Sequence, residues 1–263
     1  MSSVAERAPG QLGAGDGPDP ATIASMRRDG FTLVAGFFDA ATTARIRRWT
    51  EEIAALPEAP GRQMVYYEDS LVEPGRRVVQ RIENFCAFHP GFDRLVRFGR
   101  LARWTAALMG GPVVLFKDKI NFKLPGADGF KPHQDQQAGW SRWAPLFVTA
   151  VVTIDPATVA NGCLELVAGR HREGLIGEEW QPLPEDGLGL QPMPTAPGEV
   201  LWFDSYVPHA SKPNFTDAPR RILYLTYNLA EHGDHRALYF AEKRAAFPPD
   251  IERDGTKAYR FRV

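Results

Sequence analysis

The sequence predicts a mainly β fold, in which two sheets form a sandwich or jelly roll and helices pack outside them. After Gly111, short runs rich in β-branched and aromatic residues recur, and turn residues separate each run from the next. Before Gly111, apolar residues instead recur at helical spacing. A helical region followed by such strands is typical of a β-sandwich with flanking helices.

Three helices are expected in the first part of the chain, from the spacing of apolar residues and from capping residues. They span residues 20–29, 40–56 and 92–109. Asp19 or Thr22 is the candidate cap of the first helix, and Asp39 caps the second. Gly110 ends the third helix. A short strand over residues 31–34 follows the first helix.

Six further strands are expected after Gly111. They span residues 113–116, 120–124, 146–154, 163–167, 200–203 and 222–227. Turns separate them, as in the Pro-Gly loop at 125–129 and at Asn161-Gly162, a pair that strongly favours a tight turn. This punctuation fits the strands of a sandwich or jelly roll.

Bulk composition favours one domain of ordinary globular character. Of the 263 residues, 44% are hydrophobic and 24% are charged, which allows a sizeable buried core. We expect one domain over residues 19–263 and a disordered tail over residues 1–18, which are rich in Gly, Ala and Pro. The formal net charge of −1 gives no reason to expect nucleic acid or a membrane as partner. The oligomeric state stays open.

Cysteine content and hydropathy indicate a cytoplasmic protein. Cys86 and Cys163 are the only two cysteines, too few for a disulfide framework. No apolar run approaches the roughly 18 residues of a membrane span. The amino terminus also lacks the pattern of a secretory signal.

Two histidines and one aspartate form a candidate metal site. His133 and Asp135 are one residue apart, so on an extended strand both side chains leave the same face. His209 opens an extended segment downstream and is the candidate third ligand. Two imidazoles and one carboxylate are the protein ligands of a facial non-heme iron(II) site. Alone, His-x-Asp is more often a surface turn and a lone histidine is usually structural, but the ordered set favours a metal site.

Two arginines precede the strand at 222–227. Arg220 and Arg221 are most simply two solvated side chains, but strand alternation allows one of them to point inward. An inward guanidinium would match a carboxylate cosubstrate in bidentate fashion. Ser211 lies two residues after His209, hence on the same face, and is a candidate hydroxyl donor to that carboxylate. A turn role for Ser211 is the alternative.

These residues, in this order, resemble the phytanoyl-CoA dioxygenase family of iron(II) and 2-oxoglutarate oxygenases. The resemblance covers about residues 80–228. The matching stretches are Lys119-Ile120-Asn121-Phe122-Lys123, Pro132-His133-Gln134-Asp135, Asn161-Gly162-Cys163-Leu164 running to Gly169-Arg170-His171, and His209-Ala210-Ser211 followed by Asn214 and Arg220-Arg221. It implies a double-stranded β-helix, the jelly roll of the cupins, which agrees with the sandwich expected from the strands.

The resemblance also implies a role for each candidate site residue. The implied iron ligands, which are also the catalytic residues, are His133, Asp135 and His209. Arg220 and Ser211 would bind 2-oxoglutarate, and Arg81 and Asn121 are further candidates for contact with this cosubstrate. His171 follows the strand at 163–167 and is expected to be structural.

Iron(II), 2-oxoglutarate and dioxygen are the implied cofactor and cosubstrates, with ascorbate as a stimulant. Decarboxylation of 2-oxoglutarate to succinate and carbon dioxide would accompany oxidation of a C–H bond. Related halogenases replace the ligand carboxylate by a small residue, so that chloride can bind iron. Because Asp135 retains the carboxylate, we expect hydroxylation, or desaturation or ring closure by the same oxidant.

The sequence says less about the substrate. Residues 136–143 would lie near the pocket mouth, although packing is the more common role of tryptophan. The candidate substrate contacts there are Gln137, Trp140 and Arg142. Tyr66, Tyr67 and Arg77 lie in a region that often covers the site. These residues indicate a small polar molecule, anionic, zwitterionic or glycosidic. The chain resembles bacterial members that hydroxylate small metabolites such as aminoalkylphosphonates, or that tailor natural products.

Two other functional classes remain open on the residues alone. One is a cupin-like metalloenzyme that does not use 2-oxoglutarate, which would leave Arg220 without a role. The other is a non-catalytic binding protein on the same fold, since a fold does not guarantee activity. Such relatives usually lack at least one ligand, whereas this chain has all three.

Overall fold

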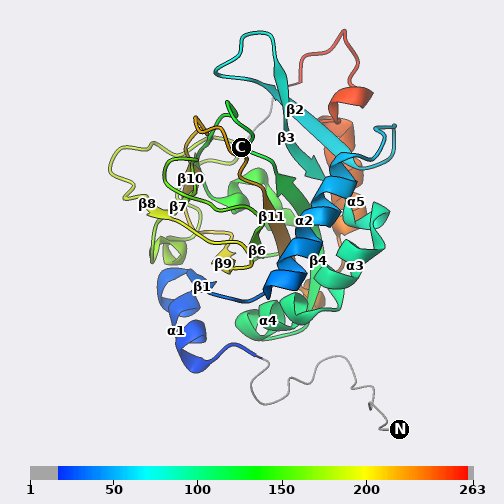
Figure 1. The fold of residues 1–263 in the computed structure, drawn as a ribbon. Helices are drawn as coiled ribbons and strands as arrows, with labels where there is room; N and C mark the ends of the chain where they lie inside the picture. Colours follow the sequence, from blue (N-terminus) through cyan, green and yellow to red (C-terminus); the bar gives the residue numbers. More distant parts are fainter. Residues whose placement is uncertain (1–16, 260–263) are drawn as a thin grey trace, which may run out of the picture.

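The computed structural model describes residues 17–259, and two antiparallel sheets form its centre (Figure 1). The tail expected over residues 1–18 lies outside the described residues, apart from residues 17 and 18. The expected mainly β fold with flanking helices is confirmed. Across residues 17–259, no helix is long and apolar enough to cross a membrane.

The larger sheet has seven strands in the order β1-β9-β6-β11-β4-β3-β2. Their bounds are Phe31–Val34 (β1), Met64–Asp69 (β2), Arg77–Glu83 (β3), Val113–Asn121 (β4), Val148–Thr153 (β6), Val200–Asp204 (β9) and Ile222–Leu229 (β11). The smaller sheet has four strands in the order β5-β10-β7-β8. Their bounds are Phe130–His133 (β5), Leu164–Leu166 (β7), Gln191–Met193 (β8) and His209–Ser211 (β10).

The two sheets pack face to face through one apolar layer. Side chains of β6, β9 and β11, such as Val151, Leu201 and Ile222, form a buried cluster with Leu164 and Leu166 of the smaller sheet. Burial of such a cluster is the main favourable term for this packing. The arrangement is the expected jelly-roll sandwich, and it holds β5 and β10 against the inner face of the larger sheet.

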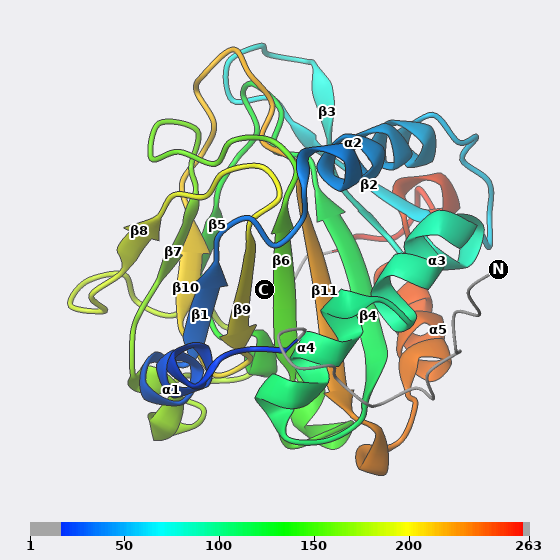
Figure 2. The same ribbon diagram turned by 60° about the horizontal axis from the view of Figure 1, so that its bottom comes forward.

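In the described part of the chain, five α-helices complete the fold. They are α1 (Pro20–Asp29), α2 (Ala40–Ala54), α3 (Pro90–Arg97), α4 (Arg100–Met109) and α5 (Arg236–Ala246). Ile46 of α2, Val96 of α3 and Leu101 of α4 share a core with residues of the larger sheet, and Figure 2 shows α3 and α4 across its outer face. Helix α5 packs elsewhere, where Phe240 meets Tyr66 of β2.

The helix expected over residues 92–109 is two helices, α3 and α4. Gly99 is extended and caps α4, and a Cβ there would lie 2.6 Å from the carbonyl oxygen of Leu95. Residue 99 therefore lies so close to the last turn of α3 that a side chain larger than that of glycine would clash with it. Asp19, rather than Thr22, caps α1, because its carboxylate accepts the Thr22 N–H at 2.7 Å.

The strands expected over 113–116 and 120–124 are one strand, β4. The charged residues between them suggested a break, but each is accommodated within the strand. Asp118 is buried and pairs with Arg236 of α5, while Lys117 and Lys119 face a cavity on the opposite side. Strands β2 and β8 and helix α5 were not expected, because their segments show neither clear alternation nor a capping signal.

Candidate metal centre and substrate cavity

The three candidate ligands meet although they come from distant parts of the chain. β5 and β10 pair antiparallel, and His133 is the direct partner of His209 in that ladder. Asp135 opens the 3-10 turn Asp135–Ala138 that follows β5. One ligand atom from each of the three residues lies within 4.8 Å of the other two. This spacing suits one metal ion held by two imidazoles and a carboxylate.

Both imidazoles present the same nitrogen to the shared space. The Nδ1 of His133 lies 2.7 Å from the Lys131 carbonyl, and the Nδ1 of His209 lies 3.0 Å from the Val207 carbonyl. A carbonyl accepts hydrogen bonds only, so each Nδ1 carries the proton and each Nε2 has a lone pair for a metal. Burial lowers the pKa of His133 to about 3 and also lowers the pKa of His209, which keeps both rings neutral.

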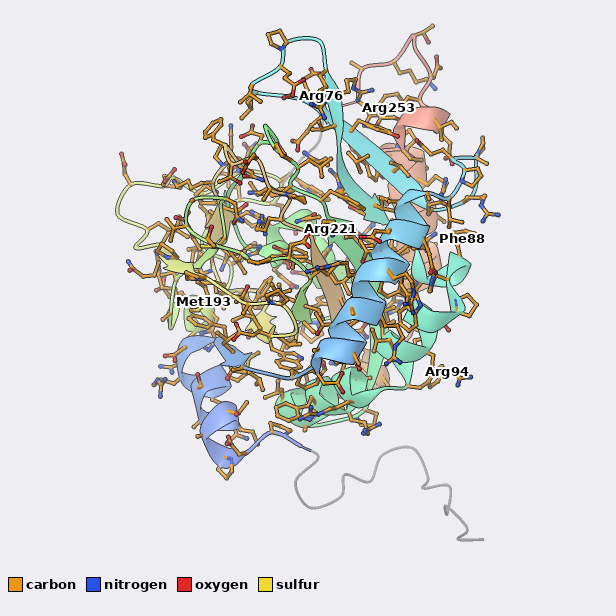
Figure 3. The ribbon with its side chains drawn as sticks, in the orientation of Figure 1. Arg76, Phe88, Arg94, Met193, Arg221 and Arg253 are labelled. Atoms are coloured by element: carbon orange, nitrogen blue, oxygen red, sulfur yellow. The ribbon has the colours of Figure 1, made fainter. Side chains whose placement is uncertain are left out.

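Arg220 and Arg221 point in opposite directions, as strand alternation predicted. Arg220 is 0% exposed, and none of its three guanidinium nitrogens has a hydrogen-bond partner among the described residues. Arg221 lies beside α2 and forms ion pairs with Asp155 at 2.6 Å and Glu51 at 3.4 Å (Figure 3). A buried guanidinium without a partner is costly, and its geometry fits a carboxylate. This observation fits 2-oxoglutarate as the missing partner.

A second basic residue, Lys123, lies next to Arg220. Its amino group donates to Ser211 Oγ at 2.7 Å, and burial followed by the nearby Arg220 charge lowers the pKa of Lys123 to about 6. Ser211 is thus held in the same corner as the arginine. Lys123 could not be recognised as a site residue from the sequence, because a lysine near a strand end usually points to solvent.

The further cosubstrate candidates, Arg81 and Asn121, are register partners on β3 and β4. Arg81 lines the cavity, donates to Glu83 at 2.8 Å and lies over the Tyr66 ring at 4.1 Å. Asn121 is 3% exposed, and its side-chain oxygen has no partner among the described residues. The inner face of the larger sheet positions both side chains.

A cavity of about 690 Å³ opens beside His133 and Asp135. Five of its lining side chains are Lys or Arg and three are Asp or Glu, so the site is basic in a chain of net charge −1. These charged residues are Arg81, Lys117, Lys119, Arg142, Lys243, Glu83, Asp135 and Glu242. The remaining wall is largely aromatic. The cavity therefore offers both positive charge and aromatic surface to a small molecule.

The loop after the metal pair has two roles. Trp140 and Arg142 line the cavity, and Arg142 forms an ion pair with Glu242 of α5. Gln137 is not a lining residue, because its amide donates to the carbonyls of Glu178 and Gln181, both at 2.7 Å. Gln137 thus holds the loop in place, and we no longer count it among the candidate substrate contacts.

The expected lid residues do not cover the cavity. Tyr66 is 1% exposed and donates to the Phe247 carbonyl, while Tyr67 and Arg77 bond to Glu58 and Asp250 outside the cavity lining. The segment that closes the cavity instead includes α5 and the residues after it. Its lining residues are Tyr239, Glu242, Lys243, Ala246, Phe247, Ala258 and Tyr259. His171 packs against Gly30 and is absent from the ligand group.

Lys117, Lys119 and α5 line the cavity but were not predicted from the sequence. Lys117, Lys119 and Asn121 alternate along β4, and such alternation of polar residues would have indicated one polar face. No comparable signal exists for Tyr239 and Lys243, because they follow the last recognisable motif.

Fold and site together define a class: a jelly-roll, non-heme iron oxygenase that uses 2-oxoglutarate. The family model described as Phytanoyl-CoA dioxygenase (PhyH) matches residues 26–222, which is most of the chain. The chain belongs to the phytanoyl-CoA dioxygenase family, as its motifs indicated. The match ends before α5.

Two relatives and one solved structure are similar over most of the chain. A 2-aminoethylphosphonate dioxygenase from an uncultured bacterium is 38% identical over 240 residues, covering 88% of this chain and 89% of the relative. A methylphosphonate hydroxylase from Gimesia maris is 38% identical over 224 residues, covering 83% and 84%. EctD from S. alaskensis, crystallised with 2-oxoglutarate and 5-hydroxyectoine, has a TM-score of 0.69 at 23% identity, covering 85% and 80%. The last likeness supports the fold alone.

The protein is therefore a non-heme iron, 2-oxoglutarate-dependent dioxygenase that acts on a small molecule. Both alternatives, a cupin-like enzyme without 2-oxoglutarate and a non-catalytic binding protein, lose their support. The relatives are named as dioxygenases and hydroxylases. Arg220, whose guanidinium has no hydrogen-bond partner among residues 17–259, would also have no role in an enzyme that does not use 2-oxoglutarate.

Proposed function

We propose that this enzyme hydroxylates a C–H bond of a small phosphonate. The observation that carries the proposal is the basic cavity, which adjoins three candidate iron ligands with ligand atoms within 4.8 Å of one another. The two relatives named for phosphonates agree with this charge. A natural-product intermediate of neutral character would leave most of the cavity's positive charge unused.

We assign His133, Asp135 and His209 as the iron ligands. When bound, iron(II) and 2-oxoglutarate supply the activation of dioxygen, with succinate and carbon dioxide as co-products. The backbone carbonyls of Lys131 and Val207 orient the two imidazoles by accepting from Nδ1. Such outer partners fix the ring orientation and raise the basicity of the ligating nitrogen. Thr149 donates to the Asp135 carboxylate at 3.4 Å and orients the third ligand.

The far carboxylate of 2-oxoglutarate would pair with Arg220, with Ser211 and Lys123 beside it. A planar guanidinium gives two parallel hydrogen bonds to a carboxylate, so it fixes the orientation of the cosubstrate as well as its position. Asn121 stays a candidate for a further contact with the cosubstrate. Arg81 lines the cavity and is engaged by Glu83, so we place it on the substrate side.

The apolar and aromatic wall excludes water from the reacting carbon. Four aromatic side chains of this wall are Phe130, Trp140, Trp143 and Trp180. A dry site protects the oxidising centre from side reactions and strengthens the electrostatic contacts within it. We further propose a cytoplasmic location, supported by two buried cysteines without a disulfide.

Replacement of the ligand carboxylate tests the proposal. In Asp135→Ala, iron binding should weaken, and conversion of methylphosphonate or 2-aminoethylphosphonate, followed by ³¹P NMR and succinate release, should be lost. Asp69→Ala removes a carboxylate that is 88% exposed and should behave as wild type. Full activity of Asp135→Ala would refute the ligand assignment. Succinate release without any hydroxylated phosphonate in the wild type would refute the substrate class.

A further inference from the structure

Two lysines of β4, a strand of the larger sheet, line the cavity. Lys117 and Lys119 leave the same face of the strand, and both line the cavity together with His133 and Asp135. Glu83 of β3 is the register partner of Lys119, and Thr226 of β11 is the partner of Lys117. The larger sheet therefore fixes where both amino groups emerge.

The acidic residues of the cavity are already engaged elsewhere. Glu83 is 1% exposed and accepts from Arg81 at 2.8 Å, and it pairs with Lys243 of α5 at 2.5 Å. Glu242 pairs with Arg142, and Asp135 belongs to the metal ligand group. Among residues 17–259, no carboxylate oxygen lies within 4.0 Å of the amino group of Lys117 or Lys119. Among the five Lys and Arg side chains that line the cavity, Lys117 and Lys119 are therefore the two without a close acidic partner.

Aromatic rings surround the two amino groups without neutralising them. The Lys119 amino group lies 4.6 Å from the Tyr224 ring centre and 5.4 Å from that of Phe130. The Lys117 amino group lies 5.3 Å from the Trp140 ring centre and 5.9 Å from that of Tyr239. Contacts of this kind offset part of the desolvation of a cation, but an anion offsets far more.

We propose that Lys117 and Lys119 form the oxyanion subsite that binds the phosphonate group and selects it over a carboxylate. This proposal rests on the proposed function, and it identifies the residues that would recognise the phosphonate group of the substrate. Burial, and then the charge of Lys117, lowers the pKa of Lys119 to about 7, and an anion bound at both amino groups would keep both protonated. Two adjacent ammonium groups match the two negative charges of a phosphonate, whereas a carboxylate would leave one of them unmatched. The Tyr239 hydroxyl, beside Lys117, is available as a further donor from α5, a segment beyond the family match.

Calorimetry on the holoenzyme tests the subsite directly. Protein loaded with iron(II) and 2-oxoglutarate is titrated without oxygen with methylphosphonate, inorganic phosphate or acetate. Lys117→Met and Lys119→Met should each weaken methylphosphonate binding about tenfold, and the double variant about a hundredfold, as expected for a charged hydrogen bond. Acetate binding should change little. Lys212→Met is the matched control, since that lysine is exposed and pairs with Glu185 outside the cavity.

Two further readouts separate a binding role from a structural or cosubstrate role. The KM for 2-oxoglutarate in substrate-free succinate release should stay at the wild-type value in every lysine variant. Lys117→Arg and Lys119→Arg retain the charge and should bind methylphosphonate more tightly than the methionine variants at the same melting temperature. If a methionine variant fails to fold, a comparison of these arginine variants with wild type still reports on binding.

Several outcomes would overturn the subsite. Wild-type affinity for methylphosphonate in the double variant would do so, as would a raised KM for 2-oxoglutarate with unchanged methylphosphonate binding. A different result would overturn only the proposed substrate. If no phosphonate is hydroxylated, but binding of methylphosphonate and inorganic phosphate depends on both lysines, the subsite stands and its natural occupant is another phosphorus oxyanion, such as a phosphate ester.

Discussion

Arg220 and Arg221 are adjacent in the sequence, yet their guanidinium groups lie on opposite faces of the strand end. Arg220 is completely buried and has no hydrogen-bond partner within residues 17–259, whereas Arg221 pairs with Asp155 and Glu51. The two residues are of the same type, so the face of the strand on which each guanidinium lies decides its role. Arg220 is the candidate ligand-binding group, and Arg221 is structural. This difference can be tested because the same substitution can be made at both positions.

Arg220→Met should raise the KM for 2-oxoglutarate about 10- to 100-fold, the worth of a charged bidentate contact, with little loss of stability. Arg221→Met should leave that KM unchanged but lower the melting temperature, because Asp155, 6% exposed, loses its main partner. Succinate assays and thermal unfolding of both variants give the comparison. Equal effects on KM would contradict the assignment of Arg220.

Asp204, at the end of β9, should make the stability of the protein depend on pH. Burial raises its pKa from 3.8 to about 6. Between these values the folded state holds a proton that the unfolded state has released, so the free energy of unfolding falls as pH rises through this interval. The shift corresponds to at most about 3 kcal/mol, and to less because the carboxyl group is partly accessible.

Asp204→Asn should therefore stabilise the protein at pH 8 and have less effect at pH 5. The amide oxygen can still accept the Tyr206 N–H, which donates to Asp204 at 2.8 Å. Guanidinium unfolding at the two pH values measures the difference. A stabilisation that is the same at both values would show that the charge of Asp204 has no part in it.

At the scale of elements, the bounds of helices and strands were predicted best where a helical or a strand periodicity of apolar residues ran without interruption. Strand β1 and helix α1 have the expected bounds, and β6, β7, β9 and β11 differ from expectation only at their ends. The pattern failed at β4, because charged residues inside a strand resemble a loop until a cavity is known to receive them. It failed at Gly99 because a close approach of backbone to backbone leaves no periodic signal.

The candidate site shows the same division. That His133, Asp135 and His209 come together was predictable, because their spacing suits strands that meet in one fold. Lys119 and Lys123 were seen only as parts of a motif, since nothing in the sequence shows which lysines lack an acidic neighbour. The contribution of α5 could not be predicted, because helix docking depends on tertiary packing and not on local sequence.

Gly162, in the turn before β7, should be sensitive to substitution. It has φ +70°, and a Cβ would lie 2.0 Å from the Lys212 carbonyl oxygen, next to β10. Gly162→Ala should therefore cost roughly 3 kcal/mol or more, from backbone strain and from the clash together. Chemical denaturation measures the free energy of unfolding.

Gly187 is the matched control for this turn. It has a similar φ of +73°, but nothing lies within 4 Å of an added Cβ. Gly187→Ala should cost only about 1–2 kcal/mol, the penalty for a left-handed backbone. If both variants lose the same stability, the close approach to Lys212 is not what requires glycine at position 162.

At the scale of the whole molecule, the two thiols should report on global unfolding. Cys86 is 1% exposed and Cys163 is 2% exposed, and burial raises the pKa of both thiols. A thiol reagent such as Ellman's reagent should modify neither in the native protein and both in guanidinium. Rapid modification of one thiol under native conditions would reveal a local opening that the packing does not suggest.

The place of β11 in the larger sheet bears on how the polypeptide reaches its native state. β11 is the last strand of the described residues, yet it lies between β6 and β4 and joins the two halves of the sheet. During synthesis those two halves have no partner along their facing edges until residues 222–229 leave the ribosome. Exposed edges of this kind favour aggregation, and such distant pairing is slow. Slower translation at lower temperature should therefore raise the yield of correctly folded enzyme.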